Sequence, residues 1–152
     1  MFRLAVETDF EILRIIYRDT VQKLAPSLYS PDQVIAWSSS PDNIPKFYNF
    51  IFNANTYLLE EKGKIIGFCG LKSDGHITSF YIHPDFTRQG YGTQLLTYVV
   101  EKGITQGILR FYTEASFFSE PVFSRCGFSI VGMETVKYGD VSFDRYKMEK
   151  VT

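Results

Sequence analysis

The amino-acid sequence predicts an α/β (α+β) fold, in which a mixed, mostly antiparallel sheet is covered by helices. Its 152 residues suit a single domain, 1–152, and 45% hydrophobic with 22% charged residues is typical of a globular core. Hydrophobic periodicity predicts helices first, then a run of strands, then a further helix between the later strands. This alternation favours a helix-covered sheet over an all-helical or all-β fold.

The N-terminal third is predicted to hold one short strand and three helical segments. Thr8 and Glu11 have the spacing of a capping box, in which two side chains satisfy the first free amides of a helix. Ser30 and Gln33 repeat this signal, with a proline at the first helical position between them. The predicted elements are a strand at Phe2–Val6 and helices at 10–24, about Pro31–Trp37, and Pro45–Phe52.

Apolar runs separated by turn residues predict the strands of the remaining chain. Glu61-Lys62-Gly63 and Asp74-Gly75 divide three runs that are rich in β-branched and aromatic residues, as hairpin turns do. A helix with one apolar face starts near Tyr91 and stops before Gly107. The predicted strands are Thr56–Glu60, Lys64–Leu71, His76–His83, Ile108–Thr113, Phe128–Lys137 and Val141–Glu149, with helices at Tyr91–Gln106 and Ser119–Cys126.

Charge and composition exclude several classes of protein. Sixteen Lys and Arg against 17 Asp and Glu give a net charge of −1, so the surface has no bulk attraction for nucleic acid or anionic membrane. No apolar run approaches the roughly 18 residues of a spanning helix, and no signal peptide pattern opens the chain. We therefore expect a soluble, cytoplasmic protein. Cys69 and Cys126 stand singly, which predicts reduced, buried thiols.

The Gly-rich segment between a predicted strand and helix is the most informative motif. Gly90 and Gly92 would let backbone amides face a ligand with no Cβ in the way, and the helix dipole favours an anion there. A dinucleotide fingerprint needs a third glycine where Leu95 stands, and a P-loop needs a lysine where Thr93 stands. The motif predicts a diphosphate site of another kind, with an ordinary tight turn as the alternative.

Two separated segments carry a family resemblance. His76–Leu96, and Glu114-Ala115-Ser116 followed by Pro121–Phe128, resemble the signatures of the GNAT (GCN5-related) N-acetyltransferases. The order of elements agrees along nearly the whole chain. Leu28–Trp37, together with Gly75-His76-Ile77, is similar to the YafP-type subgroup. The resemblance implies a GNAT fold, whose sheet is splayed at its centre with helices on both faces.

The resemblance also implies acetyl-CoA as co-substrate and an amine as acceptor. The pantetheine arm would pair with Phe80, Tyr81 and Ile82 as an added strand. The diphosphate would lie on the backbone amides of Arg88, Gln89, Gly90, Tyr91, Gly92 and Thr93. Ser116 stands at the usual Asn position of the family, and Tyr29 and Trp37 fall where it places its acceptor wall, although core filling is an alternative for both aromatics.

The acetylation of an amine requires a base, because only the neutral amine is a nucleophile. His76 falls at the family's base position, and an imidazole with a pKa of about 6.5 suits neutral pH; its alternative is an exposed strand residue. Glu114 is a second candidate base, acting through water. Phe123 replaces the Tyr that protonates the leaving thiolate, so Tyr112 or Tyr138 would serve instead, or the thiolate leaves unassisted.

The sequence therefore predicts an acetyl-CoA-dependent N-acetyltransferase that acts on a primary amine by direct attack on the thioester. A catalytically weak acyl-CoA-binding module is the alternative, and Phe123 favours it. The expected acceptor is a small molecule or a peptide, and a homodimer agrees with family habit. We expect no metal, because His76 and His83 lack further ligands at suitable spacing.

Overall fold

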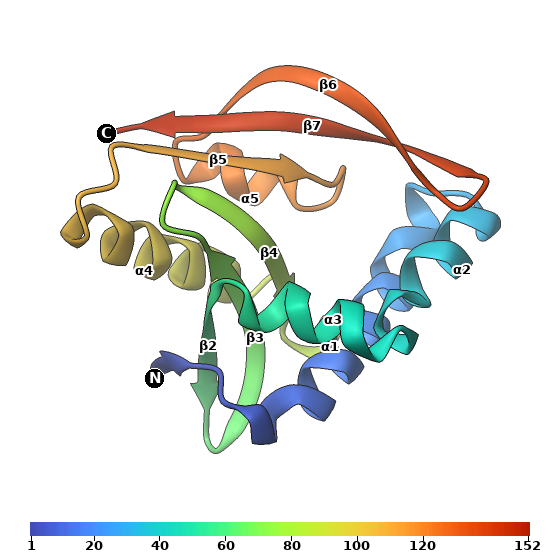
Figure 1. Cartoon of the computed structure of the whole chain (residues 1–152), viewed down its shortest axis with the longest axis horizontal. Helices are drawn as coiled ribbons and strands as arrows, with labels where there is room; N and C mark the ends of the chain where they lie inside the picture. The colour runs from blue at the N-terminus through green and yellow to red at the C-terminus, as the bar shows by residue number, and fades with distance from the viewer.

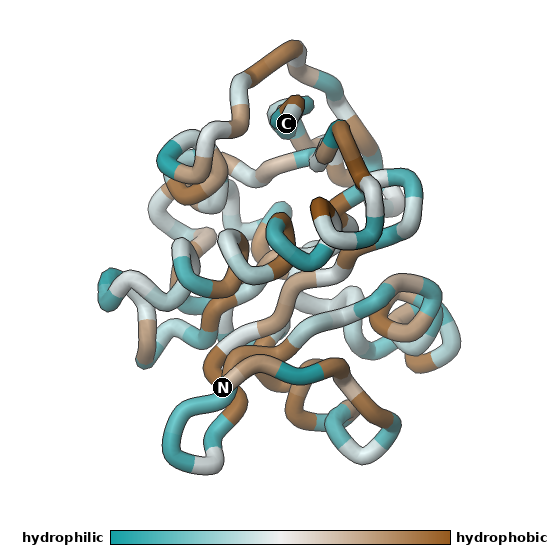
Figure 2. The backbone as a smooth tube through the Cα atoms, turned by 90° about the vertical axis from the view of Figure 1, so that its left-hand side faces the viewer, coloured by the Kyte–Doolittle hydropathy of each residue, from teal (hydrophilic) through white to brown (hydrophobic).

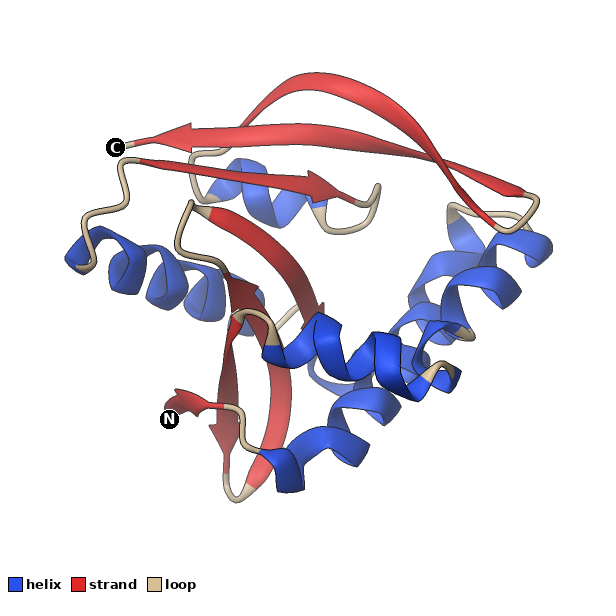
Figure 3. Ribbon diagram, in the orientation of Figure 1, coloured by secondary structure: helices blue, strands red, loops and turns tan.

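A seven-stranded sheet runs through the molecule, and helices cover both of its faces (Figures 1 and 3). The computed structural model describes residues 1–152. The strands are β1 (Phe2–Leu4), β2 (Asn55–Glu61), β3 (Lys64–Leu71), β4 (His76–Ile82), β5 (Arg110–Ala115), β6 (Ser129–Tyr138) and β7 (Val141–Val151). The helices are α1 (Phe10–Leu24), α2 (Pro31–Ser38), α3 (Ile44–Phe52), α4 (Tyr91–Thr105) and α5 (Glu120–Arg125).

The strand order is β1-β2-β3-β4-β5-β7-β6, and β4–β5 is the one parallel pair. This arrangement confirms the predicted mixed, mostly antiparallel sheet. The largest shift in an element falls on β5, which was predicted from Ile108 and begins at Arg110. Ile108 is buried, and its amide donates to the Gly103 carbonyl at 3.0 Å, so the chain first completes the end of α4.

The start of α1 differs from its prediction, because Thr8 makes no capping hydrogen bond. A 3₁₀ turn at Glu7–Asp9 precedes the helix, and Asp9 Oδ2 accepts the Val6 amide at 2.8 Å. The Arg3 guanidinium also donates to both Asp9 oxygens, at 2.8 and 2.9 Å, and this contact holds the pKa of Asp9 below its ordinary value. The start of α1 is therefore tied to β1 instead of being capped locally.

The capping box of α2 is confirmed, and one of its residues makes a further hydrogen bond that the sequence did not indicate. Ser30 Oγ accepts the Gln33 amide at 3.2 Å, and Gln33 Oε1 accepts the Ser30 amide at 2.9 Å. Gln33 Nε2 also donates to the Ser142 carbonyl of β7 at 2.8 Å. One side chain thus caps α2 and fastens it to the β6–β7 hairpin.

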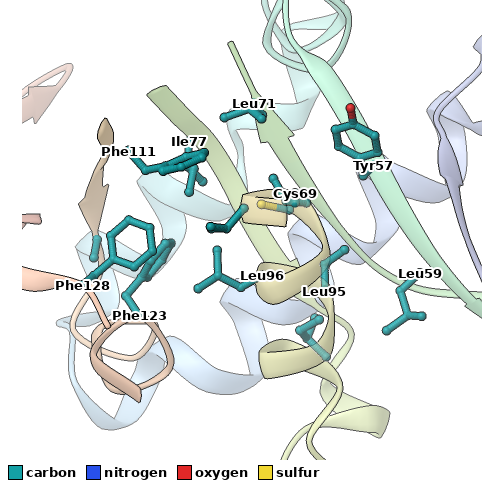
Figure 4. Packing of buried hydrophobic residues seen from close by; sticks show 14 of the residues in the cluster. Tyr57, Leu59, Cys69, Leu71, Ile77, Leu95, Leu96, Phe111, Phe123 and Phe128 are labelled. Carbon is teal, nitrogen blue, oxygen red and sulfur yellow. The ribbon is translucent and has the colours of Figure 1, made fainter. Parts of the chain in front are cut away.

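Two apolar cores lie on opposite faces of the sheet. Helices α4 and α5 cover the first, where Leu95, Phe111 and Phe123 are almost fully buried (Figure 4). Helices α1, α2 and α3 cover the second, around residues such as Leu13 and Phe68. Hydrophobic and hydrophilic stretches alternate along the helices (Figure 2), as expected when each helix buries one face.

The two cysteines have different surroundings. Cys69 is fully buried, and burial raises the pKa of its thiol. Cys126 is partly exposed at the end of α5, so the prediction of two buried thiols is wrong for Cys126. No helix of the structure is both long and apolar enough to cross a membrane.

Candidate active site

The sheet opens between β4 and β5. The two strands pair at only two positions, the second of which joins Ile77 to Thr113 (Figure 1). On its other side β4 changes register with β3 between Ile77 and Ser79, so that Thr78 is an extra residue that bends the strand. Beyond Thr78 the edge of β4 that faces β5 has no partner strand. Its peptide groups therefore need another partner, as the family resemblance implied.

Six consecutive backbone amides, from Arg88 to Thr93, donate to no other group of the chain. Positive φ angles at Arg88 (61°) and Gly90 (84°) shape this loop, and α4 begins directly after it at Tyr91. Free amides at the start of a helix form an anion site, which the helix dipole strengthens. This geometry fits a diphosphate.

The two loop glycines have different functions, although the sequence analysis gave them the same one. A Cβ on Gly90 would meet no atom within 4 Å, so this glycine is required for its left-handed backbone and leaves open space beside the amides. A Cβ on Gly92 would lie 3.3 Å from the Phe80 ring and 3.5 Å from Val122. Gly92 therefore lets α4 approach β4 and α5 closely.

A cleft of about 370 Å³ lies beside this loop, between α1, the end of β4 and α5. Arg88 and Arg125 both line it, and no carboxylate pairs with either side chain. No sequence motif pointed to Arg125 as a residue of this wall. On the α1 side, Thr20 Oγ1 donates to the Ile82 carbonyl at 3.1 Å, so that carbonyl already has a partner.

A second cavity, of about 160 Å³, lies where β4 and β5 part and extends to α1, α2 and α3. Many aromatic side chains line it, from α1, α2, α3, the β6–β7 hairpin and the segment before α2. Trp37 of α2 and Tyr29 of that segment are among them. Trp37 Nε1 donates to the Tyr81 hydroxyl at 3.3 Å, and the Tyr29 hydroxyl accepts the Phe117 amide at 2.9 Å. The two predicted wall residues thus come together at one cavity.

Glu114 and His76 form a pair at the edge of this second cavity. His76 Nε2 lies 2.9 and 3.1 Å from the two Glu114 oxygens, and its ring stacks on Tyr112 with centroids 4.6 Å apart. Burial raises the pKa of Glu114, but the hydrogen bond and charge of His76, with Arg145 and Lys147, outweigh burial and bring it below its ordinary value. Glu114 lines the cavity, whereas His76 does not.

The candidate acids Tyr112 and Tyr138 lie in different places. The Tyr112 hydroxyl donates to Asp74 at 2.6 Å, outside both cavities, and this carboxylate raises the pKa of Tyr112. Tyr138 lines the second cavity from the β6–β7 hairpin. Phe123 is only 1% exposed and packs edge-on against Phe80, with ring centroids 5.3 Å apart.

The two cavities meet at shared wall residues, which are Phe80, Phe118 and Ser119. Ser116 lies next to this junction, where its Oγ accepts the Ser119 amide at 3.1 Å and donates to Ser119 Oγ at 2.8 Å. Ser119 was not among the site residues predicted from the sequence. Its place three residues after Ser116, before a short helix, is the only sequence signal that could have found it.

Each of the two cavities collects a different set of the predicted residues. Of the predicted loop residues, Arg88, Gly90, Gly92 and Thr93 line the first cavity, whereas Gln89 and Tyr91 do not. The predicted acceptor-wall residues line the second cavity. His83 lies in the turn after β4, where its Nδ1 accepts the Asp85 amide at 3.2 Å. No group of three or more His, Cys, Asp or Glu side chains gathers closely enough to hold a metal ion.

Comparisons with known proteins identify the family and the fold. A family model described as an acetyltransferase (GNAT) domain matches residues 27–150. The uncharacterised N-acetyltransferase YafP of Escherichia coli K12 is 24% identical over 140 residues, which cover 92% of this chain and 88% of that protein. A GCN5-related N-acetyltransferase structure from Rhodopseudomonas palustris has a TM-score of 0.95 and 25% identity, over 100% of this chain and 95% of that one. The PaiA N-acetyltransferase of Thermoplasma acidophilum, solved with coenzyme A, has a TM-score of 0.80 and 18% identity, over 100% of this chain and 98% of that one.

Proposed function

The chain belongs to the GNAT family of acetyltransferases, and on that premise we propose that it moves the acetyl group of acetyl-CoA to a primary amine by direct attack on the thioester. The observation that carries this proposal is the meeting of two unlike cavities at Phe80 and Ser119. One cavity has free amides beside it, and the other has aromatic walls and a carboxylate.

The residues of the first cavity fit coenzyme A. Its diphosphate would accept from the free amides of Arg88–Thr93, and the unpaired Arg88 and Arg125 would add positive charge. Its pantetheine arm would bond to the unpaired edge of β4 at Phe80 and Tyr81, toward the second cavity. Acetyl-CoA supplies the thioester whose carbonyl carbon accepts the amine.

We assign the acceptance of the amine's proton to Glu114. Glu114 lines the acceptor cavity and His76 does not, so the carboxylate is the group that an amine in the cavity would contact. His76 then acts as a positioning residue, because its Nε2–H donates to the carboxylate and keeps it ionised. The earlier assignment of His76 as the base itself is the rival interpretation, and the two differ in their pH profiles.

The leaving thiolate needs no proton donor in this proposal. Phe123 has no proton to give, and the pKa of a thiol, about 8–9, makes the thiolate a tolerable leaving group. Direct attack is supported by the positions of the two thiols, since neither Cys69 nor Cys126 lines either cavity. No cysteine is therefore placed to carry the acetyl group.

Two measurements together test the proposal. Calorimetric titration with CoA and acetyl-CoA should give one binding site per chain, and a panel of primary amines should release free thiol from acetyl-CoA. Absence of binding at millimolar acetyl-CoA would reject the co-substrate. Binding without thiol release from any amine would instead support the catalytically weak acyl-CoA-binding module, which Phe123 favours.

A further inference from the structure

Tyr112 and His76 face each other where the two halves of the sheet join. They are the first of the two residue pairs that connect β4 to β5, and the second pair is Ile77 with Thr113. Their rings stack with centroids 4.6 Å apart and an angle of 3° between the planes. Neither side chain lines either cavity, so neither contacts the acceptor or the co-substrate in the proposed function.

One carboxylate holds both members of this stack. Asp74 Oδ1 accepts the backbone amide of His76 at 3.0 Å, and Asp74 Oδ2 accepts the Tyr112 hydroxyl at 2.6 Å. The second bond has an ionised acceptor, and hydrogen bonds of that class are about twice as strong as neutral ones. Asp74 thus ties the start of β4 to the side chain of its neighbour on β5.

The hydroxyl of Tyr112 is poorly placed to protonate a leaving thiolate. It donates to Asp74, and this carboxylate raises the pKa of Tyr112 above its ordinary value. A group with a raised pKa gives up its proton less readily, and Tyr112 also lies outside both cavities. The contacts of Tyr112 therefore favour another function than the acid for which the sequence made it a candidate.

The hydrogen bond between His76 and Glu114 needs a defined orientation of the imidazole ring. Rotation of a histidine ring about χ2 is broad and roughly two-fold, so an unrestrained His76 ring would face the carboxylate only part of the time. The two side chains are 25% and 23% exposed, and exposed ion pairs contribute little because ordering both side chains costs entropy. The stack on Tyr112 restricts the ring to the orientation in which Nε2 lies 2.9 Å from Glu114 Oε1.

Other charged groups surround the pair of His76 and Glu114. They belong to the neighbouring strands β5, β6 and β7, and they are Arg110, Glu134, Asp144, Arg145, Lys147 and Glu149. Arg145 and Lys147 act with His76 to lower the pKa of Glu114. Arg110 contacts the stack, with its guanidinium 5.0 Å from the centre of the Tyr112 ring, and it is paired with Glu149 at 2.8 Å. A change in the Tyr112 side chain would leave these charges in place.

We infer that Tyr112 is a positioning residue, whose ring is anchored by Asp74 and holds the plane of His76 so that Nε2 faces Glu114. This inference rests on the proposed function, because Glu114 is the base in that function. The titration of Glu114 in the free protein measures the positioning, and it does not depend on acetyl transfer.

Tyr112→Leu removes the stacked ring and leaves His76 and Glu114 unchanged. The side-chain carboxyl carbon of Glu114 would be followed by NMR from about pH 3 to about pH 8, with its signal identified by its loss in Glu114→Gln. The titration should move to higher pH, because His76 is no longer held against the carboxylate. Tyr98→Leu is the matched control, since it removes a ring that stacks on Phe2 with centroids 4.1 Å apart, outside both cavities. An unchanged titration in Tyr112→Leu, or an equal shift in Tyr98→Leu, would overturn the inference.

Tyr112→Phe separates the ring from its hydroxyl group. The phenyl ring can still stack on His76 but loses the bond to Asp74, so the Glu114 titration should move by less than in Tyr112→Leu. A titration equal to that of the unmodified protein would reject Asp74 as the anchor.

Thiol release from acetyl-CoA by a primary amine distinguishes the positioning residue from the acid. In Tyr112→Phe it should stay within about threefold of the unmodified protein at about pH 8, because no proton donor is lost. A loss of about 10²-fold at every pH, with an unmoved Glu114 titration, would assign Tyr112 as the acid and overturn the inference. Failure of the proposed function would instead appear as absent thiol release in the unmodified protein, whatever the titration shows.

Discussion

At the scale of single residues, the charge of Glu114 is decided by two opposing effects. Partial burial favours the neutral acid, whereas the His76 hydrogen bond and the positive charges of His76, Arg145 and Lys147 favour the carboxylate. The second effect wins, so the pKa of Glu114 lies below its ordinary value. A base must be deprotonated to accept a proton, and His76 therefore extends activity toward lower pH.

Removal of His76 should move the acid limb of the pH–rate profile to higher pH. In His76→Gln the charge next to Glu114 is lost while burial remains, so the pKa of Glu114 rises and a higher pH is needed to ionise it. Thiol release measured from about pH 3 to about pH 9, a range that includes the lowered pKa of Glu114, checks this shift, with CoA affinity as the unchanged control. A limb that moves to lower pH, or disappears, would show that His76 itself takes the proton.

Glu114→Gln is the companion variant. It keeps a side chain of similar shape but removes the proton acceptor, and loss of a general base typically lowers kcat by about 10²-fold or more. Calorimetry should show unchanged binding of CoA, because Glu114 does not line the cofactor cleft. Turnover within about threefold of the unmodified protein would exclude Glu114 as the base.

Gly90→Val should abolish CoA binding. A branched side chain at a φ of 84° is strained, and it would fill the open space beside the free amides. Gly107→Val is the matched control, since Gly107 has a φ of 89°, also has open space around its Cβ position, and lies at the other end of α4. Both variants should lose similar stability, but only Gly90→Val should lose CoA in calorimetry. Loss of CoA binding in both would mean that strain alone is responsible.

At the scale of elements, the contact between β1 and α1 depends on one buried carboxylate. Asp9 accepts from Val6 and from Arg3, and Arg3 Nε also donates to Glu60 of β2 at 2.7 Å. The pKa of Asp9 is lowered mainly by the Arg3 hydrogen bond. Its stabilisation is therefore present above the unfolded pKa of about 3.9 and is lost as pH falls through the lower folded value.

Asp9→Asn should destabilise the protein by about 1–3 kcal/mol near neutral pH, because Arg3 loses its charged partner while the Val6 amide keeps an oxygen acceptor. Urea unfolding at about pH 7 and about pH 3 measures this, and the difference should shrink at the acid pH. Asp140→Asn removes the same charge at an exposed turn without a partner and should change little. A difference that persists at acid pH would argue against the ion pair.

Elements set by local signals could be predicted from the sequence, and contacts between distant segments could not. Ser30 and Gln33 lie three residues apart, so their capping box was visible, but the bond from Gln33 to Ser142 spans 109 residues. Thr8 had the correct spacing for a capping residue. Asp9 instead bonds to the backbone before α1, and its carboxylate also accepts from Arg3. The capping-box rule was therefore wrong at Thr8, because it considers only neighbouring residues and not the contact between Asp9 and Arg3.

In the candidate site, too, locally determined features could be predicted and long-range contacts could not. The free amides of the Gly-rich loop were predictable, because they depend on backbone conformation within six residues. The pairing of His76 with Glu114 requires the parallel register of β4 with β5, and no pattern within either strand specifies that register. The contact of Trp37 with Phe143 requires α2 to meet a hairpin from the far end of the chain, so the aromatic wall residues could be named but not their packing partners.

At the scale of the whole molecule, the sheet consists of two halves that are joined narrowly. Strands β1–β4 form one half and β5, β7 and β6 the other, and two residue pairs connect them. The Thr113 hydroxyl donates across this seam to the Ile77 carbonyl at 3.0 Å. A ligand that bonds to the open edge of β4 would therefore stabilise the junction between the two halves, where few hydrogen bonds connect them.

Hydrogen exchange with two ligands can resolve this effect. CoA should protect the amides of both Thr78–Ile82 and Arg88–Thr93, because its arm and its diphosphate reach both segments. ADP has the diphosphate but no pantetheine arm, so it should protect the loop alone. At a concentration one hundred times its Kd, a ligand adds about 2.7 kcal/mol to stability, and CoA should raise Tm accordingly. Equal protection of β4 by ADP and CoA would mean that the strand edge responds to loop ordering and not to the arm, and the split between β4 and β5 would then have no direct part in holding the co-substrate.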